Sequence, residues 1–464
     1  MKAHHKYNSP IVLKLGKGPA ALSTAITLPR DLATYFPTVA RHPFPFLLES
    51  AGSGRFTFLG SNPYAVLVAR GDRLSLWRED REKTFRGNPF DVVAELLAER
   101  KPENDRDLPL PGGAIGAFGY DLGRHLEKLP RRAEDDLDFP DLLLGFYDRL
   151  VQVDHREGRA SIVELTDRAE RRAIDPRTYD EAFGGAPSTR ERGANFTHER
   201  YLEAVRRAKE YIAAGDVYQV NLSQRFHARV ETPPYEVYRR LREISPAPYA
   251  AFFGFGRRAI LSASPEQFLE LRGRTLVTRP IKGTRRRSDN DDEDERLRQE
   301  LHASAKDDAE LAMIVDLERN DLGRVCEYGS VQVSAAKTLE SHPTVHHLVA
   351  TIEGTLRRGL GPVDVLRATF PGGSVTGAPK IRAMEIIDEL EPTRRSFYTG
   401  AIGSLGFDGS MNLSIAIRTV IADGSDFFFQ AGGGIVADSD PEAEYLETLA
   451  KAAAPARALG VSLL

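Results

Sequence analysis

Short runs of apolar residues, separated by turn residues, fill the first third of the chain. Residues 64–69 and 74–77 are two such runs, and Arg70, Gly71 and Asp72 lie between them. Apolar runs of this length, broken by Gly and Asp, are typical of strands joined by tight turns. The Gly-rich stretch 112–121 lacks the G-x-G-x-x-G spacing of a dinucleotide site, so we expect a packed strand there too. The pattern predicts an antiparallel sheet.

The regular spacing of apolar residues stops between residues 183 and 195, where Gly, Pro, Ser and Thr mix with alternating charges. Such a composition indicates a linker. A chain of 464 residues with 41% apolar content is long enough for more than one domain. We therefore predict an N-terminal α+β domain at residues 1–185 and a second domain at residues 195–464.

The second domain is predicted to open with a helix. Thr197 can cap this helix, Tyr201, Val205 and Ala208 recur at helical spacing, and Gly215 can end it. Further strands are expected at 217–226, 259–262 and 267–271, and further helices at 296–320 and 381–391; the acidic run 289–295 is expected as a solvated loop and helix start. Because strands and helices do not alternate regularly, we predict an α+β fold with large antiparallel sheets.

The composition of the chain argues against several classes of partner and location. The net charge of −4 and the sequence pI near 6.3 give no general attraction to polyanions, so no nucleic-acid partner is expected. Cys326 is the only cysteine, which excludes a disulfide framework within one chain and favours a reducing compartment. No signal peptide and no apolar run of membrane-spanning length is found, so we expect a cytoplasmic location without a membrane partner.

Lys282 is the strongest candidate for chemistry. It lies in the segment 280–284, Pro-Ile-Lys-Gly-Thr, where a lysine beside a glycine–threonine turn can act as a nucleophile.

Two pairs of acids have the spacing of ligands on a helix face. Asp307 and Glu310 are three residues apart, as are Glu444 and Glu447, so each pair would lie on one face of a helix. Carboxylate oxygens are ligands that Mg²⁺ prefers. Acids at this spacing also occur on ordinary solvated helix faces, and that reading stays open.

Three further features could bind an anion. The triplet 432–434 consists of glycines, whose backbone N–H groups could form a turn around an oxyanion. Arg418 lies in the alternating run 413–419 and shares its parity with Ser414, so it can point away from the core and bind a carboxylate. Tyr398 could add a hydroxyl donor, although packing is the commoner role of a strand tyrosine.

Several segments together resemble the chorismate-utilising enzymes: 280–284, 313–324, 432–439, and above all the decapeptide 371–380, Pro-Gly-Gly-Ser-Val-Thr-Gly-Ala-Pro-Lys. The resemblance is dense from residue 196 to residue 464 and looser before the linker. It implies the chorismate-binding fold, with large antiparallel sheets in a sandwich-like core and helices outside. It also implies that residues 195–464 form the catalytic domain.

The resemblance implies a role for each candidate. Glu310 and Glu447 would be direct Mg²⁺ ligands, with Asp307 and Glu444 in the surrounding shell. Lys282 would be the nucleophile, Glu266 the general acid and base, and His347 a catalytic or orienting group. The residues expected to bind chorismate are Gly283, Thr284, Ser374, Tyr398, Arg418, Gly433, Gly434 and Lys451.

Lys282 also distinguishes branches of this family. The branch that makes anthranilate typically has alanine at this position, and the branch that makes 4-amino-4-deoxychorismate for 4-aminobenzoate and folate synthesis has lysine. Ser374 and Thr376 also resemble the latter branch. We therefore expect amination of chorismate. The alternatives are anthranilate formation and, in another class, a noncatalytic tryptophan-sensing subunit; the pattern of the isochorismate-forming enzymes is not found.

The resemblance also implies two partners besides chorismate. The chain offers no Cys-His-Glu set for glutamine hydrolysis, so ammonia would come from a separate glutamine amidotransferase subunit. Tryptophan is a candidate ligand, because the segments containing Ser50, Pro246 and Tyr249 resemble those that line a tryptophan pocket in the family. Ordinary packing is an equally good explanation of these segments.

Overall fold

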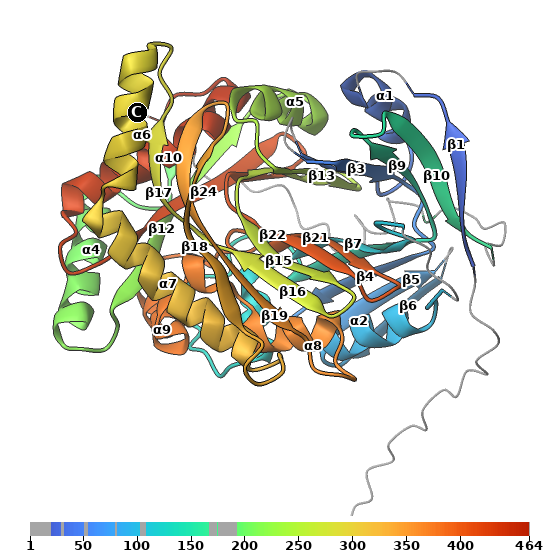
Figure 1. Cartoon of the computed structure of the whole chain (residues 1–464), viewed down its shortest axis with the longest axis horizontal. Coiled ribbons are helices and arrows are strands. Elements are labelled where there is room, and N and C mark those ends of the chain that lie inside the picture. Colours follow the sequence, from blue (N-terminus) through green and yellow to red (C-terminus); the bar gives the residue numbers. More distant parts are fainter. Residues whose placement is uncertain are drawn as a thin grey trace, which may run out of the picture.

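The computed structural model describes residues 20–28, 32–50, 54–78, 81–102, 108–166, 174 and 193–463. In this part of the chain two twelve-stranded sheets, here sheet A and sheet B, are stacked face to face (Figure 1). The α+β prediction with large antiparallel sheets in a sandwich-like core is confirmed.

Sheet A lies uppermost in Figure 1 and combines strands from both ends of the chain. Its strand order is β1 (Ala21–Ile26), β10 (Arg159–Leu165), β9 (Arg149–Asp154), β3 (Phe56–Gly60), β2 (Phe46–Glu49), β13 (Tyr249–Phe255), β14 (Arg258–Ser264), β23 (Thr419–Asp423), β24 (Asp426–Ile435), β12 (Gln219–Arg229) and β11 (Gly193–Ala194), with β20 (Gly377–Ala378) also paired to β12.

Sheet B likewise combines strands from the N-terminal and C-terminal parts of the chain. Its strand order is β17 (Ile281–Arg286), β19 (Val345–Thr355), β16 (Thr275–Arg279), β15 (Gln267–Arg272), β22 (Met411–Ile415), β21 (Ala401–Gly406), β7 (Gly113–Phe118), β8 (Leu142–Tyr147), β4 (Ala65–Arg70), β5 (Arg73–Arg78) and β6 (Arg81–Arg86), with β18 (Gln332–Ser341) also paired to β19.

Helices cover the outer faces of both sheets. Their bounds are α1 (Leu32–Val39), α2 (Pro89–Ala98), α4 (His198–Ala213), α5 (Pro234–Ile244), α6 (Asp291–His302), α7 (Ala305–Gly323), α8 (Pro362–Thr369), α9 (Lys380–Leu390) and α10 (Pro441–Leu459), with short 3₁₀ helices η1 (Tyr120–His125) and η2 (Gly373–Val375). In Figure 1, α1 and α5 lie above sheet A, whereas α2 and α8 lie below sheet B.

The buried apolar side chains form layers that follow this arrangement. One cluster fills the space between the sheets, with Phe46 and Phe253 from sheet A facing Val66 and Ile402 from sheet B. Other clusters lie between sheet A and α5 and α10, and between sheet B and α2, α7 and α8. Burial of apolar area on both faces of each sheet supplies the main driving force for this architecture.

The predicted local elements agree well with the structure. Strands β4 and β5, the fully buried strand β7, and helix α4 with its Thr197 cap lie where the pattern placed them. The predicted helical segment 296–320 is divided into α6 and α7. The division occurs because the Ser304 hydroxyl accepts a hydrogen bond from the Asp307 N–H and caps a new helix.

The two predicted domains stay a prediction, because residues 183–192 of the proposed linker 183–195 lie outside the described residues. The described strands before and after it share both sheets. A search of the described helices found none that combines the length and the apolar character needed to cross a membrane.

One buried ion pair joins several of these elements. Both the Arg395 and the Glu391 side chains are 1% exposed, and the Arg395 guanidinium donates to both Glu391 carboxylate oxygens, at 2.9 and 2.6 Å. Arg395 also donates to the carbonyls of Val375 in η2 and Asn221 in β12, at 3.0 and 2.8 Å. The Ser223 hydroxyl completes the set by donating to Glu391 at 2.6 Å.

We predict that Arg395→Met lowers the free energy of unfolding by about 3–5 kcal/mol, because Glu391 would remain buried without its counter-charge. Urea unfolding would measure the loss. The exposed pair between Arg207 and Glu210 provides the control, since Arg207→Met should cost less than about 1 kcal/mol. Equal, small losses in both variants would contradict the structural importance of the buried pair.

Candidate active site

The candidate residues gather where β17 of sheet B and β24 of sheet A approach helices α7 and α10, at the left of Figure 1. Lys282 lies in β17, where the pairing with β19 shifts register between Lys282 and Thr284. Gly283 takes φ +71 at this bulge, and a Cβ there would lie 2.8 Å from Leu301 and 2.9 Å from Asp307. The bulge re-aims the lysine and lets α7 pack closely against its strand.

The surroundings of Lys282 make its ammonium group easier to deprotonate. Burial lowers the pKa of Lys282, Glu310 and Glu266 raise it, and Lys451 lowers it, with a net decrease. A desolvated amine that loses its proton more easily is a better nucleophile at neutral pH.

Glu266 lies in the connection from β14 to β15 and is 4% exposed. Its backbone is fixed on both sides, because its N–H donates to the Ser264 hydroxyl and its carbonyl accepts from the Ile415 N–H. Burial raises the pKa of Glu266, whereas the Ser374 hydroxyl, Lys282 and Lys451 oppose the rise. Its Oε1 atom has no hydrogen-bond partner among the described residues, so a bound polar group could occupy that position.

His347, in β19, is a neutral imidazole in this site. Burial is the largest cause that lowers its pKa to about 3, and the charges of Arg418 and His342 add to the effect. Its Nδ1 lies 2.9 Å from the Thr284 hydroxyl oxygen, which fixes the ring beside the bulge. Its Nε2 is buried and has no partner in the described part of the chain.

The glycine triplet does not form the predicted turn. Residues 432–434 continue the strand β24, where Gly432, Gly433 and Gly434 pair with β12, so the expected anion-binding turn is wrong. A Cβ on Gly433 would lie 2.8 Å from Glu444 Oε2 and 3.4 Å from Glu447 Oε1. The missing side chain therefore lets the carboxylates of α10 lie against the strand.

The four predicted metal-binding carboxylates come from two helices, Asp307 and Glu310 from α7 and Glu444 and Glu447 from α10. Burial raises the pKa of Glu310, and the charges of Asp307 and Glu447 add to the rise. Burial also raises the pKa of Glu444, which accepts a hydrogen bond from Ser439 at 2.7 Å. Carboxylates that oppose one another's ionisation form a donor set that suits a hard divalent cation.

These carboxylates do not form a closed cage. Among the described residues, no three or more His, Cys, Asp or Glu side chains lie close enough together to hold a metal ion. Glu447 is instead paired with Lys451 at 2.6 Å, and although burial raises the pKa of Glu447, Lys451 brings it below its ordinary value. Lys451 also donates to the Gly432 carbonyl at 2.9 Å.

The remaining predicted binding residues lie on turns beside this cluster. Ser374 in η2 is 5% exposed, and its buried hydroxyl lies near enough to Glu266 to lower the pKa of that carboxyl, although it does not reach hydrogen-bond geometry with any group of the described chain. Tyr398 is buried, which raises the pKa of its phenol, and Arg395 lies 5.7 Å from its ring centroid. Arg418 does not continue a strand as predicted: β22 ends at Ile415, and Arg418 has φ +48 in the connection to β23. That connection turns Arg418 toward His347, whose pKa it lowers.

Three buried polar residues of this region were not among the candidates expected from the sequence. Arg395 and Glu391 form the ion pair under Tyr398, and their i,i+4 spacing was the available signal. Gln219 is completely buried, with neither amide atom hydrogen-bonded within the described residues, and its Nε2 lies 2.6 Å from the Cβ position of Gly434. The signal in the sequence was an amide side chain at a strand position whose neighbours predict burial.

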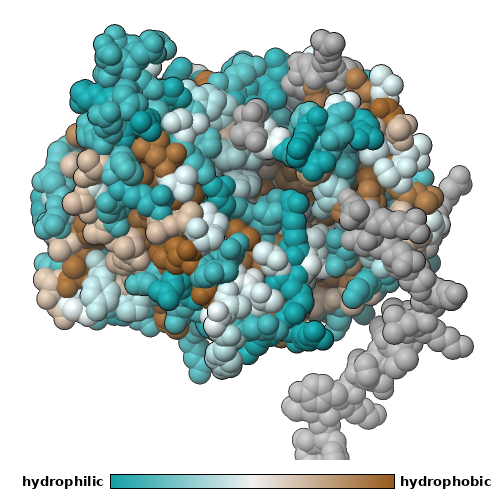
Figure 2. All heavy atoms as spheres, viewed as in Figure 1, coloured by the Kyte–Doolittle hydropathy of each residue, from teal (hydrophilic) through white to brown (hydrophobic). Residues whose placement is uncertain are grey.

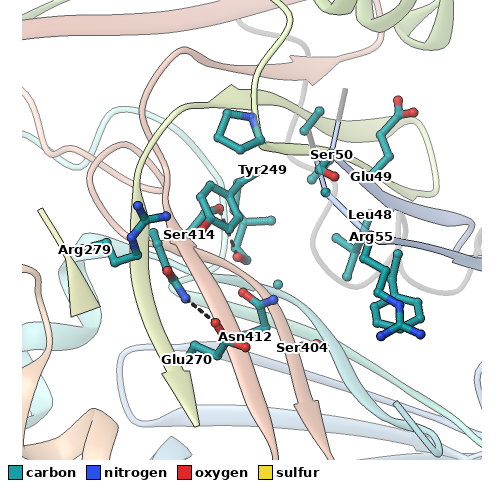
Figure 3. A pocket seen from close by; sticks show the side chains of 18 of the residues that line it. Leu48, Glu49, Ser50, Arg55, Tyr249, Glu270, Arg279, Ser404, Asn412 and Ser414 are labelled. Atoms are coloured by element: carbon teal, nitrogen blue, oxygen red, sulfur yellow. Dashed lines mark hydrogen bonds between the residues drawn. The ribbon is translucent and has the colours of Figure 1, made fainter. Parts of the chain in front are cut away.

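A cavity of about 510 Å³ opens between the two sheets. Figure 2 shows the hollow from outside, and Figure 3 shows the side chains that line it. Ser50 and Tyr249 line this cavity, as the tryptophan-pocket prediction requires. Pro246 does not line it, whereas Pro248 does. The lining also includes Pro265, Gln267 and Ile281, which are the chain neighbours of Glu266 and Lys282.

Known proteins are similar to this chain over most of its length. The family model described as chorismate binding enzyme matches residues 44–457. Aminodeoxychorismate synthase component 1 of Escherichia coli is 44% identical over 423 residues, covering 90% of this chain and 93% of that protein. Anthranilate synthase component 1 of Thermus thermophilus is 40% identical over 457 residues, covering 93% and 96%.

A solved structure gives the same result for the fold. Anthranilate synthase component I from Streptococcus pneumoniae superposes with a TM-score of 0.76 at 34% identity, covering 87% of this chain and 92% of that one. The chain therefore belongs to the chorismate binding enzyme family.

Proposed function

We propose that this protein aminates chorismate to 4-amino-4-deoxychorismate, as component 1 of an aminodeoxychorismate synthase. The observation that carries the proposal is Lys282, a lysine with a lowered pKa, placed at a β-bulge and electrostatically coupled to Glu266 and Glu310. The identity to the E. coli aminodeoxychorismate synthase component 1 supports the same choice.

The first chemical step needs a nucleophile and an acid. The neutral Lys282 amine attacks C2 of chorismate, the ring double bonds shift, and the C4–O bond breaks. Glu266, whose raised pKa keeps a proton available, protonates the departing hydroxyl so that it leaves as water. The result is a covalent bond between Lys282 Nζ and the ring.

The second step reverses the double-bond shift. Ammonia attacks C4, the double bonds return, and the C2–Nζ bond breaks. Glu266, now a carboxylate, takes the proton that the new amine loses, and Lys282 leaves as a neutral amine. Both residues are thereby restored, and the net reaction is chorismate plus ammonia giving 4-amino-4-deoxychorismate plus water.

Binding residues and a metal would orient the substrate. We propose that Tyr398, Arg418 and the backbone of Gly283, Gly433 and Gly434 bind chorismate, together with Thr284, Ser374 and Lys451. His347 would orient the enolpyruvyl group through its partnerless Nε2. Glu310 and Glu447 would hold Mg²⁺, with Asp307 and Glu444 around it, and the bound ion would supply positive charge to a substrate carboxylate.

Ammonia would be supplied by a partner, a glutamine amidotransferase that forms component 2. Cys326 is the only cysteine of the chain, it is buried, and burial raises the pKa of its thiol to about 11. A thiol of that kind is a poor nucleophile for glutamine hydrolysis. We propose in addition that tryptophan is the ligand of the cavity between the sheets.

Lys282→Ala should reduce amination by at least about a thousandfold, because no other group replaces the covalent nucleophile. Mass spectrometry of the products from chorismate, ammonium and Mg²⁺ would measure it, and the intact-protein mass would reveal the adduct in the wild type. Lys83→Ala is the matched control, since Lys83 is exposed in the edge strand β6, far from the candidate site in the strand order of sheet B. Normal turnover by Lys282→Ala would contradict the mechanism, and anthranilate with pyruvate as products would favour the other branch.

Glu447→Gln should raise the Mg²⁺ concentration needed for half-maximal activity by about tenfold or more, since a ligand oxygen loses its charge. A Mg²⁺ titration of the rate and of the thermal unfolding midpoint would measure the change. Glu442→Gln, on the exposed side of the same helix, is the control. An unchanged Mg²⁺ requirement in Glu447→Gln would mean that these acids form only a solvated helix face.

Ser50→Phe should abolish tryptophan binding, because the larger side chain would fill part of the cavity between the sheets. Isothermal titration calorimetry with L-tryptophan would measure binding to the wild type and to the variant. Pro246→Ala should bind normally, since Pro246 does not line the cavity. Absence of binding to the wild type would leave the Ser50 and Tyr249 segments with a packing role.

A further inference from the structure

Glu318 is a buried carboxyl group of α7 that the proposed reaction does not use. It is 6% exposed and lies in the inward stripe of the helix, which consists of Leu311, Ile314, Val315, Glu318, Asp321 and Leu322. The other acid of this stripe, Asp321, is neutralised by Lys380 at 2.5 Å. Glu318 makes no such ion pair within the described residues.

One contact of Glu318 and one contact of the preceding residue lead toward the candidate active site. The Thr278 hydroxyl donates to Glu318 Oε2 at 2.6 Å, and Thr278 lies in β16, four residues before Lys282. Leu317, the preceding residue of α7, packs against η2, where a Cβ on Gly373 would lie 2.6 Å from it. The next residue of η2 is Ser374, whose hydroxyl acts on Glu266. Glu318 therefore contacts β16, the strand before β17, while its neighbour Leu317 packs against the loop that carries Ser374.

The charged groups around Glu318 favour its protonated form. Burial is the largest cause that raises its pKa to about 8; the Thr278 hydrogen bond lowers it, the charges of Glu266 and Asp321 raise it, and Lys380 lowers it. Glu318 is consequently neutral at pH 7 and becomes a carboxylate as the pH rises through about 8.

We infer that Glu318 is a positioning residue for Glu266: a neutral carboxyl that hydrogen-bonds Thr278 and leaves Glu266 as the carboxyl that exchanges a proton. The inference rests on the proposed function. Glu266 gives its proton to the leaving hydroxyl and later takes one from the new amine, whereas Glu318 keeps its own proton throughout. A second negative charge in this apolar region would raise the pKa of Glu266, hold its proton and impede the first transfer, to the leaving hydroxyl.

The test compares pH profiles of ammonium-dependent amination at a constant concentration of neutral ammonia. Wild-type kcat should fall above about pH 8, by up to about tenfold per pH unit for a single ionisation. Glu318→Gln keeps a neutral, hydrogen-bonding side chain, so it should retain activity at pH 7 and lose the alkaline fall. Thr278→Val should move the fall to higher pH, because the hydrogen bond that lowers the pKa of Glu318 is removed.

A purely structural role of Glu318 would reduce the rate equally at every pH and leave the position of the fall unchanged, and this result would overturn the inference. Infrared difference spectroscopy gives a readout independent of activity. The wild type should lose one protonated-carboxyl band with a midpoint near pH 8, and Glu318→Gln should lack that band.

The two measurements separate the two claims. A band that titrates near pH 8 in a protein that never aminates chorismate would overturn the proposed function alone. Amination with the same alkaline fall in Glu318→Gln, or absence of the band from the wild type, would overturn the inference.

Discussion

The buried ion pair between Glu391 and Arg395 is the constraint on which the site depends. Each charge would be costly in the core alone, and each is compensated by the other and by backbone or hydroxyl groups of β12 and η2. Because these partners belong to segments distant in the sequence, the pair fixes them relative to one another. Tyr398 and the Ser374 loop are therefore held in place before any substrate binds.

Burial then sets the chemistry of the groups that this frame surrounds. The same loss of water lowers the pKa of Lys282 and raises the pKa of Glu266, since in each case the charged form is the one disfavoured. The proposed reaction needs a neutral amine and a protonated carboxyl at the same pH. Glu318 follows the same principle, because a neutral Glu318 adds no second negative charge that would act on Glu266.

Close approach of helices to strands is the second requirement of the site. Gly283 and Gly433 lack the Cβ atoms that would collide with Asp307 of α7 and Glu444 of α10. Carboxylates from two helices can thus face a lysine on a strand. The cavity between the sheets lies on the other side of the same segments, since it is lined by the neighbours of Lys282 and Glu266.

The sequence by itself determined the local elements and the fold class, and it supplied the candidates for the reacting residues. Hydrophobic periodicity depends on neighbours along the chain, so it predicted α4, β7 and the helical positions of Glu310 and Glu447 correctly. Tertiary structure decided which residues meet. The glycine triplet forms a strand because β12 pairs with it, and Arg418 leaves its strand because the chain crosses there from sheet B to sheet A. Such pairings depend on contacts between residues far apart in sequence, and periodicity carries no information about them.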